Sequence, residues 1–385
     1  MKVSDYLVSR LADAGVSHVF MLTGGGAMHL NDSFGKEPRM RYVCNHHEQA
    51  CAMAAEGYAR IAGRPAAVNV TTGPGGLNAL NGVWGAYTDS LPMIVLSGQV
   101  KRETCMSTYP GMALRQLGDQ EVDIVRIASA ITKYAVMLRE PNRARYEIEK
   151  AIHLATTGRP GPVWIDVPID VQASTIDPDE LEPYMPPPPA AADAARLRAQ
   201  CDDLVARIRK AERPAILLGS GIRVGHAEAE LERVIRKLQI PVTTSWTAID
   251  LLGSDDPLYC GRPGSVGDRP GNFTIQNSDL VITLGSRLPI RQVSYNFAAF
   301  AHHAFKVQVD IDPAELEKPY GKPDLGIVAD LREFLIALDA NLGAAQPDPR
   351  HAKWLAWCKE RLARYPVVLP KHSAPAKLIN PYHFS

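Results

Sequence analysis

Hydrophobic residues along the first 175 positions follow two alternating spacings. The short apolar runs HVFML, PAAVNVTT, MIVLSG and PVWIDVP have the length and composition of buried strands, and the segments between them repeat apolar residues every three or four positions, as helices do. Strands that alternate with helices form parallel sheets covered by helices on both faces. Residues 1–175 are therefore predicted to form a doubly wound α/β domain.

A second region with the same alternation covers residues 196–345. It opens with the helical pattern ARLRAQCDDLVARIRKAE, and its strand candidates are PAILLGSG, IPVTTSW, DLVITLGS, FKVQVDID and LGIVAD. Residues 176–195 break both spacings, and the four consecutive prolines at 186–189 predict an extended, stiff linker. The predicted fold class is α/β, with two doubly wound parallel-sheet domains joined by a proline-rich linker.

Residues 346–385 continue neither pattern. They contain one amphipathic helix pattern, HAKWLAWCKERLARY, followed by the segment PVVLPKHSAPAKLINPYHFS, in which no strand pattern is visible. We expect this tail to connect the second domain to a further domain that is absent from the sequence.

Composition and charge exclude several classes of protein. Lysine plus arginine and aspartate plus glutamate number 42 each, which leaves no long-range field to attract nucleic acid or an anionic membrane. No apolar run reaches the roughly eighteen residues of a membrane span, and the N-terminus lacks the core of a signal peptide. The six cysteines are scattered, as is typical of a reducing compartment. We therefore expect a cytoplasmic protein whose partners are small molecules, with no nucleic acid and no membrane among them.

One acidic residue, Glu48, stands near the start of an almost wholly apolar helix pattern at residues 43–63. Helix chemistry alone accounts for it, because Asn45 is a good N-cap and Glu48 follows three residues later, as in a capping box. A functional account is also open, because a carboxylate on a buried helix is a candidate proton site. The local pattern does not decide between the two.

A glycine-rich turn, TTGPGGLNAL at residues 71–80, lies between a strand pattern and a helix pattern. Ligands gather at the carboxyl ends of strands in doubly wound sheets, and glycines let the backbone approach a ligand closely. An ordinary tight turn is the alternative. The similar stretch MLTGGGAMHL is not a phosphate-binding Walker loop, because no Gly-Lys-Ser/Thr follows it.

The second region also has glycine and charged residues where its strand patterns end. Gly219 and Gly221 follow one strand pattern, Gly285 and Arg287 follow another, and Asp310 ends a third. An acidic residue at such a position binds ribose hydroxyls and an arginine binds phosphate, so either a nucleotide site or ordinary surface turns are expected. The glycine pattern is too short for a dinucleotide-dependent dehydrogenase, and no metal ligands are predicted, because no histidine or cysteine falls at zinc spacing.

Taken together, the motifs of the first region resemble the N-terminal, pyrimidine-binding domain of thiamine diphosphate enzymes, most nearly the acetolactate synthase-like group. These motifs are HEQ-x-A, T-G-P-G-x-x-N, D-S-x-P-M-x-x-L-x-G-Q, Q-E-V-D-I and T-K-Y, in that order. The resemblance extends from residue 1 to about residue 330 and so includes the middle domain of that family.

The resemblance implies roles for individual residues. Glu48 is implied to hydrogen-bond N1′ of the thiamine aminopyrimidine and to favour the tautomer that activates the cofactor. Gln120 matches the glutamine of the family's F-Q-E stretch near the reacting end. Lys133 matches the lysine of its T-K-H/Y stretch and is implied to be catalytic, although a lone lysine before a strand is also explained as a solvated charge. The residues implied to line the pyrimidine side are Thr72, Gly73, Pro74, Gly75 and Asn78. Those resembling flavin-binding positions of the middle domain are Gly219, Gly221, Arg223, Gly285, Arg287, Asp310 and Ile311.

Three departures from the family pattern change what the resemblance implies. Asp119 stands where many acetolactate synthases have phenylalanine before Gln-Glu, which puts specificity for two pyruvate molecules in doubt. The residues after Arg287 differ from the flavin-side pattern, so either FAD is retained or an adenine nucleotide such as ADP replaces it. The family's G-D-G motif is missing, so Mg²⁺ is expected to bind only through the absent diphosphate-binding domain.

The leading hypothesis from the resemblance is a thiamine diphosphate-dependent 2-oxo acid decarboxylase or carboligase with pyruvate as the donor. The chain would be an incomplete or split enzyme, inactive without the missing domain, which a separate chain could supply. A homo-oligomer, dimer or tetramer, is implied. The alternative is a catalytically silent module that binds FAD or ADP and serves dimerisation.

Overall fold

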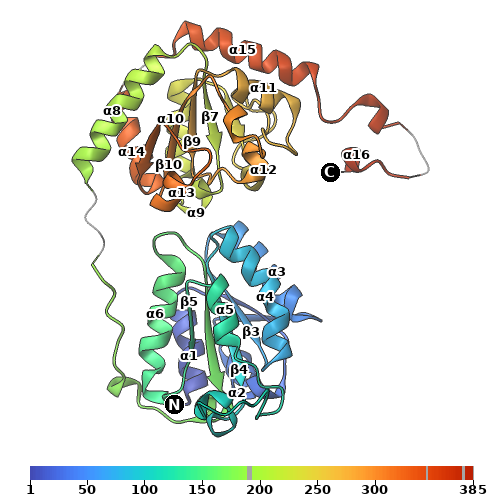
Figure 1. Ribbon diagram of the computed structural model, residues 1–385, viewed down its shortest axis with the longest axis vertical. Helices are drawn as coiled ribbons and strands as arrows, with labels where there is room; N and C mark the ends of the chain where they lie inside the picture. The colour runs from blue at the N-terminus through green and yellow to red at the C-terminus, as the bar shows by residue number, and fades with distance from the viewer. Residues whose placement is uncertain (189–192, 344–345, 375–377, 385) are drawn as a thin grey trace. The chain divides into compact units, whose positions relative to one another are not determined.

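The computed structural model describes residues 1–188, 193–343, 346–374 and 378–384. The chain divides into two compact units, Met1–Ala190 and Ala191–Ser385, and each has its own sheet and hydrophobic core (Figure 1). No helix in these ranges is both long and apolar enough to span a bilayer.

The first unit is built on a sheet of six described strands in the order β2-β1-β3-β4-β6-β5, and every neighbouring pair is parallel. Strands β3, β4 and β6 are buried along their whole length, which explains why they read as mostly apolar runs rather than as an alternation of polar and apolar residues. The strands are β1 (His18–Met21), β2 (Arg41–Cys44), β3 (Ala66–Val70), β4 (Met93–Gln99), β5 (Tyr134–Met137) and β6 (Pro162–Pro168).

Helices cover both faces of this sheet. On one face α1, α2, α6 and α7 pack on one another, and on the other α3 packs along α4, which also contacts α5. Gly82 lies directly against Ala52, so small residues let α3 and α4 approach closely. The helices are α1 (Val3–Asp13), α2 (Met28–Lys36), α3 (Glu48–Ala62), α4 (Pro74–Thr88), α5 (Ile124–Ala128), α6 (Ala144–Thr156) and α7 (Ile169–Ala173), with 3-10 turns η1 (Gly25–Ala27), η2 (Arg102–Thr104), η3 (Met106–Thr108), η4 (Ser129–Ile131), η5 (Pro141–Arg143) and η6 (Pro178–Glu180).

The second unit has five described strands in the order β11-β10-β9-β7-β8, again all parallel. Helices α8, α10 and α14 share the larger hydrophobic core with this sheet. The strands are β7 (Pro214–Leu218), β8 (Val242–Thr244), β9 (Leu280–Leu284), β10 (Phe305–Asp310) and β11 (Leu325–Val328). The helices are α8 (Ala194–Lys210), α9 (Gly221–Val224), α10 (Glu228–Leu238), α11 (Arg269–Asn277), α12 (Ile290–Val293), α13 (Pro313–Glu317), α14 (Leu331–Leu342), α15 (Pro349–Arg364) and α16 (Pro381–Phe384), with 3-10 turns η7 (Trp246–Ala248), η8 (Phe297–Ala299) and η9 (Pro370–His372).

The two parallel-sheet α/β units confirm the predicted fold class. The predicted linker at 176–195 begins inside the first unit, because Ile176 and Leu181 are buried in its core. Residues 189–192 of that linker, 344–345 of the predicted second domain, and 375–377 and 385 of the predicted tail lie outside the described residues.

The helix of the predicted tail, α15, packs on the second unit. Trp354 and Cys358 are buried against Cys260, and the Trp354 indole donates to the Pro214 carbonyl at 3.0 Å. Lys359 Nζ adds hydrogen bonds to two carbonyls of the Asp256–Tyr259 turn. An amphipathic helix buries its apolar stripe on the nearest core, so this part of the tail belongs to the packing of the second unit.

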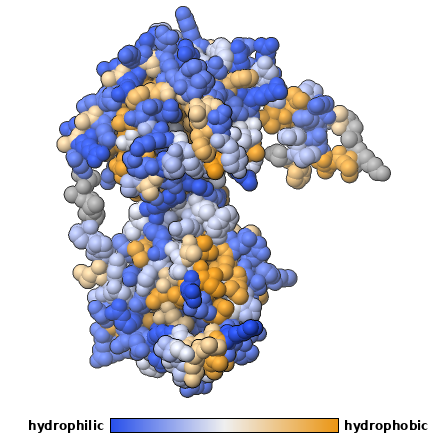
Figure 2. Space-filling model, viewed as in Figure 1, coloured by the Kyte–Doolittle hydropathy of each residue, from blue (hydrophilic) through white to orange (hydrophobic). Residues whose placement is uncertain are grey.

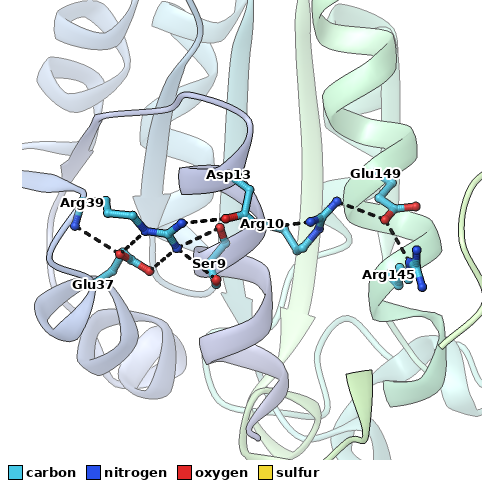
Figure 3. Close-up of polar contacts among 7 residues, drawn as sticks. All are labelled: Ser9, Arg10, Asp13, Glu37, Arg39, Arg145 and Glu149. Carbon is cyan, nitrogen blue, oxygen red and sulfur yellow. Dashed lines mark hydrogen bonds and ion pairs between the residues drawn. The ribbon is translucent and has the colours of Figure 1, made fainter. Parts of the chain in front are cut away.

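A surface network of ion pairs connects α1 to its neighbours in the first unit (Figure 3). The Arg39 guanidinium binds both Glu37 and Asp13, and the bond to Arg39 holds the pKa of the Glu37 carboxyl below its usual value. Arg10 joins Asp13 to Glu149 of α6. Exposed pairs of this kind contribute at most about 1 kcal/mol each, so they orient α1 and α6 more than they stabilise the unit.

Candidate functional site

The connections that follow β2, β3 and β4 all lie at the carboxyl edge of the first sheet, because its strands are parallel. This edge is where doubly wound sheets bind ligands. The connection after β2 leads to Glu48, the connection after β3 contains Gly73, and the connection after β4 contains Gln120.

Glu48 is the first residue of α3, and only 8% of it is exposed. The expected Asn45 cap is wrong: the N-cap is His47, whose Nδ1 accepts from the Gln49 amide at 3.1 Å. The helix starts two residues later than a capping box requires, so the Glu48 carboxylate does not close a box. Its Oε2 accepts instead from Asn78 Nδ2 at 3.0 Å, which joins the start of α3 to α4.

The turn before α4 brings backbone against this carboxylate and against Gln120. Gly73 has φ 59° and ψ −111°, a conformation that side chains with a Cβ rarely adopt, and a Cβ on it would lie 1.9 Å from the Gln120 carbonyl oxygen. A Cβ on Gly75 would lie 3.4 Å from Glu48 Oε1 and 2.8 Å from Cγ2 of Thr71. Pro74 is the first residue of α4, where its missing N–H costs nothing. The structure therefore brings together Glu48, Gly73, Pro74, Gly75, Asn78 and the backbone of Gln120.

Two buried polar atoms in the connections after β2 and β3 have no hydrogen-bond partner within the described ranges: Asn45 Oδ1 and Thr72 Oγ1. Thr72 is 4% exposed, and its hydroxyl contacts Gly26 so closely that a Cβ there would lie 1.9 Å away. Burying a polar atom without a partner is costly, so such atoms are candidates for ligand contact. Thr72 was among the predicted residues, whereas Asn45 was considered only as a cap.

Lys133 lies at the other edge of the sheet. It precedes β5, and its Nζ donates to the Thr157 carbonyl at 2.8 Å while its stem packs on Gly161, beside the start of β6. Burial lowers the pKa of its ammonium group. The structure does not bring Lys133 together with Glu48, because strand starts and strand ends lie at opposite edges of a parallel sheet.

An acidic side chain that sequence reasoning missed lies within the first sheet. Asp166 on β6 is fully buried opposite Ser97 of β4; it accepts from Ser97 Oγ at 2.5 Å and from Gln99 Nε2 at 2.9 Å. Burial raises the pKa of Asp166 to about 7. The pattern PVWIDVP did not indicate this residue as a site candidate, because a single aspartate in an apolar run is easily taken to mark the end of the strand.

In the second unit the three predicted glycines contact one another. A Cβ on Gly219 would lie 2.1 Å from the Gly285 carbonyl oxygen, and a Cβ on Gly221 would lie 2.7 Å from Gly285 Cα. The Gly219 amide donates to the Leu284 carbonyl and the Gly221 amide to the Gly285 carbonyl. These glycines are explained by backbone packing between two strand ends. Arg223, the next predicted residue, forms an ion pair with Asp250 at 2.8 Å.

The remaining predicted residues of this unit occupy the same carboxyl edge. Asp310 ends β10 and accepts from the Asp312 amide at 3.0 Å, Arg287 is exposed, and Ile311 is 37% exposed. Buried side-chain atoms without a hydrogen-bond partner among the described residues lie at the end of β8 and within β10 as well. They are Oγ1 of Thr244, Oγ of Ser245 and Oε1 of Gln308. The run VTTS in the sequence was the signal that could have revealed the first two.

The part of the chain that the structure describes contains no group of three or more His, Cys, Asp or Glu side chains placed to hold a metal ion.

A buried carboxylate facing a glycine-lined turn at a sheet edge, with a second parallel-sheet unit after it, defines the class of two-domain α/β enzymes that bind an organic cofactor. Comparison with family models narrows the class. Residues 1–127 match the thiamine pyrophosphate enzyme N-terminal TPP binding domain, and residues 201–338 match the thiamine pyrophosphate enzyme central domain. The chain belongs to the thiamine pyrophosphate enzymes, through their N-terminal and central domains.

Curated relatives agree with this family. The probable acetolactate synthase 2, chloroplastic, of Oryza sativa subsp. japonica is 33% identical over 382 residues, covering 95% of this chain and 54% of that protein. The acetolactate synthase isozyme 1 large subunit of Escherichia coli strain K12 is 32% identical over 372 residues, covering 97% of this chain and 63% of its own length. The chain thus spans a little over half the length of these relatives.

Proposed function

We propose that the chain forms the pyrimidine-binding and middle portions of a thiamine diphosphate-dependent decarboxylase or carboligase of acetolactate synthase type, acting on a 2-oxo acid with pyruvate as the donor. The observation that carries the proposal is the Glu48 carboxylate, buried in the first turn of α3 and held by Asn78 beside the Gly73 turn. When bound, thiamine diphosphate supplies the carbon nucleophile for such a reaction.

The residues present fit the aminopyrimidine of this cofactor. Gly73 and Gly75 leave open the space that side chains would fill, and Thr72 Oγ1 and Asn45 Oδ1 are buried polar atoms without a partner among the described residues. A planar ring with amino and ring-nitrogen groups is suited to such a surface, because it needs close backbone approach and a few directed hydrogen bonds.

We assign to Glu48 the role of sharing a proton with N1′ of the aminopyrimidine ring. Its Oε2 is held by Asn78, and its Oε1 faces the open side of Gly75, so Oε1 is the oxygen positioned to share a proton with a ring nitrogen. Asn78 orients the carboxylate, and Gln120, with its backbone against Gly73, is assigned to the substrate side.

The rest of the site is proposed to come from a diphosphate-binding domain that also holds Mg²⁺, either on a separate chain or on a longer form of this one. Association through the first unit is supported by exposed apolar side chains on α3 and α4, which include Met53, Ile61, Leu77, Trp84 and Tyr87. Figure 2 shows hydrophobic side chains gathered over α4 and α5. A dimer or tetramer is proposed accordingly. A cytoplasmic location is proposed from the scattered cysteines.

FAD or ADP is proposed for the carboxyl edge of the second sheet. The support is the set of buried atoms on Thr244, Ser245 and Gln308 that have no hydrogen-bond partner within the described part of the chain, together with Asp310 at the end of β10. A catalytically silent binding module is not favoured, because Glu48 and Asn78 are arranged as a proton site and the relatives are named acetolactate synthases.

The experiment is Glu48→Gln, measured as pyruvate consumption with thiamine diphosphate, Mg²⁺ and the diphosphate-binding domain supplied. The amide cannot exchange the proton, so turnover is expected to fall roughly 100-fold or more. Glu56→Gln on the same helix is the matched control, since Glu56 pairs with Arg60. Equal turnover of Glu48→Gln and the control would contradict the proposal.

A further inference from the structure

The loop between β4 and α5 folds around one buried carboxylate. Glu121 is 7% exposed, and its Oε1 accepts from the Met106 amide at 2.6 Å. Its Oε2 accepts from the Leu117 amide at 3.3 Å and from the Gly118 amide at 3.2 Å. Three backbone donors from two separate stretches of the loop therefore meet on a single side chain.

The other side-chain hydrogen bonds in the middle of this loop come from exposed residues: Thr108 and Tyr109 donate to carbonyls of η2, and Ser107 accepts from Arg139. The loop's secondary structure is limited to the short turns η2 and η3, and residues 107–117 are exposed throughout. Its base is fixed separately, because Gln99 Nε2 donates to both the Val122 carbonyl and Asp166. Hydrogen bonds from backbone amides to a carboxylate are stronger than neutral ones, so Glu121 is the internal frame of the loop.

The residue that precedes this frame lies beside the cofactor turn. Gln120 has φ 60°, a left-handed conformation that is unfavourable for a residue with a side chain, and its carbonyl contacts Gly73. A strained backbone persists only where its surroundings hold it, and the surroundings here are Gly73 on one side and the Glu121-framed loop on the other.

The geometry points to Glu121 as a positioning residue: by collecting the Met106, Leu117 and Gly118 amides, it holds the loop so that Gln120 lies against the Gly73 turn and faces the substrate. This inference rests on the proposed function for its catalytic consequence, but its structural part does not. Glu121 itself acts through Gln120.

The test compares Glu121→Gln with Glu103→Gln. Glu103 lies in the same loop, with its side chain 72% exposed and 3.8 Å from Lys101, so its substitution makes the same chemical change without touching the frame. The glutamine amide at 121 presents a donor to the loop amides and loses at least one of the three hydrogen bonds. Hydrogen exchange followed by mass spectrometry on peptides covering residues 105–119 needs neither cofactor nor partner domain.

We expect exchange of these amides to be roughly tenfold faster in Glu121→Gln and unchanged in Glu103→Gln. In the assembled enzyme, Glu121→Gln should raise the KM for pyruvate roughly tenfold with thiamine diphosphate affinity within about twofold of wild type, because Gln120 moves and Glu48 does not. Glu121→Asp, which keeps the charge, should recover part of the KM.

Equal exchange in the two glutamine variants would overturn the role of Glu121, whatever the activity. A lower kcat at unchanged KM would also overturn it, since a merely structural role reduces the amount of active protein without displacing Gln120. Absence of pyruvate turnover in the assembled wild-type enzyme would instead contradict the proposed function, and the exchange result would still decide whether Glu121 frames the loop.

Discussion

The two units share a parallel, doubly wound architecture, yet the glycines at their strand ends have different neighbours. In the first unit Gly73 and Gly75 face the Gln120 backbone and the Glu48 carboxylate, next to buried polar atoms without partners among the described residues. In the second unit Gly219, Gly221 and Gly285 touch one another. A glycine at the carboxyl end of a strand thus indicates close backbone approach in both units, and the units differ in what is approached: a loop backbone and a carboxylate in the first, other glycines in the second.

The largest expected effect on the proposed site comes from Gly73→Ala. The new Cβ would overlap the Gln120 carbonyl, and the backbone would be held in a conformation that costs an alanine about 2 to 3 kcal/mol. We expect thiamine diphosphate binding, measured by calorimetry on the assembled enzyme, to weaken roughly 100-fold. Gly35→Ala, where a Cβ meets nothing within 4 Å, is the control. Unaltered binding in Gly73→Ala would show that Gly73, like the glycines of the second unit, does not serve the cofactor.

Gly285→Ala should have its effect on stability. With φ at 63°, a Cβ would lie 2.8 Å from Gly221 Cα and 2.5 Å from Leu331 Cδ1, so strain and overpacking together should cost about 3 kcal/mol. Urea unfolding of the second unit measures this loss. Thiamine diphosphate affinity should stay at its wild-type value, and a variant as stable as wild type would show that the glycine contact is not tight.

Asp166 makes the stability of the first unit depend on pH. Burial raises its pKa to about 7 in the folded protein, against an ordinary value of 3.8 when unfolded. An acidic group whose pKa is higher in the folded protein makes its full contribution to stability at pH values below its unfolded pKa. That contribution is lost as the pH rises through the folded pKa of about 7, and a pKa difference of this size corresponds to about 4 kcal/mol.

The measurement is the free energy of unfolding from pH 4 to pH 8 for wild type and Asp166→Asn. Wild type should lose stability relative to the variant across this range, because only the aspartate ionises. Asp170→Asn is a control of opposite sign, since hydrogen bonds from Arg102 lower the pKa of that carboxyl. A difference between wild type and Asp166→Asn that does not change with pH would contradict the assignment.

The smallest effect is expected for Lys133→Met. The ammonium group binds the Thr157 carbonyl at the amino edge of the sheet, so its loss should cost about 1 kcal/mol and change turnover less than about threefold. Pyruvate consumption and thermal unfolding measure the two quantities. A drop in turnover comparable to that of Glu48→Gln would show that Lys133 takes part in the reaction. It would also show that the site is not confined to the carboxyl edge of the sheet.

Much of this molecule follows from local pattern. The runs that become β3, β4 and β6 are mostly apolar because those strands are buried on both faces, and the alternation with helices is enough to predict two parallel sheets. The motifs around Glu48, Gly73 and Asn78 also led to the family that the comparisons show. Local pattern failed at the cap of α3, where His47 replaces the expected Asn45, because a cap depends on which residue the preceding strand delivers to the helix start.

By itself the sequence determined the element types and the two-sheet architecture, and it supplied a set of candidate residues for the first sheet edge. Only the tertiary structure decided which of the predicted residues are neighbours. It places Lys133 away from Glu48 and Asn78 in hydrogen-bond contact with Glu48, and it packs the glycines of the second unit against one another. It also revealed Asp166 and Glu121, whose surroundings come from segments distant in the chain or from a folded loop. The physical reason is range: periodicity records which face of an element is buried, whereas hydrogen bonds and pKa values depend on atoms that only folding brings close.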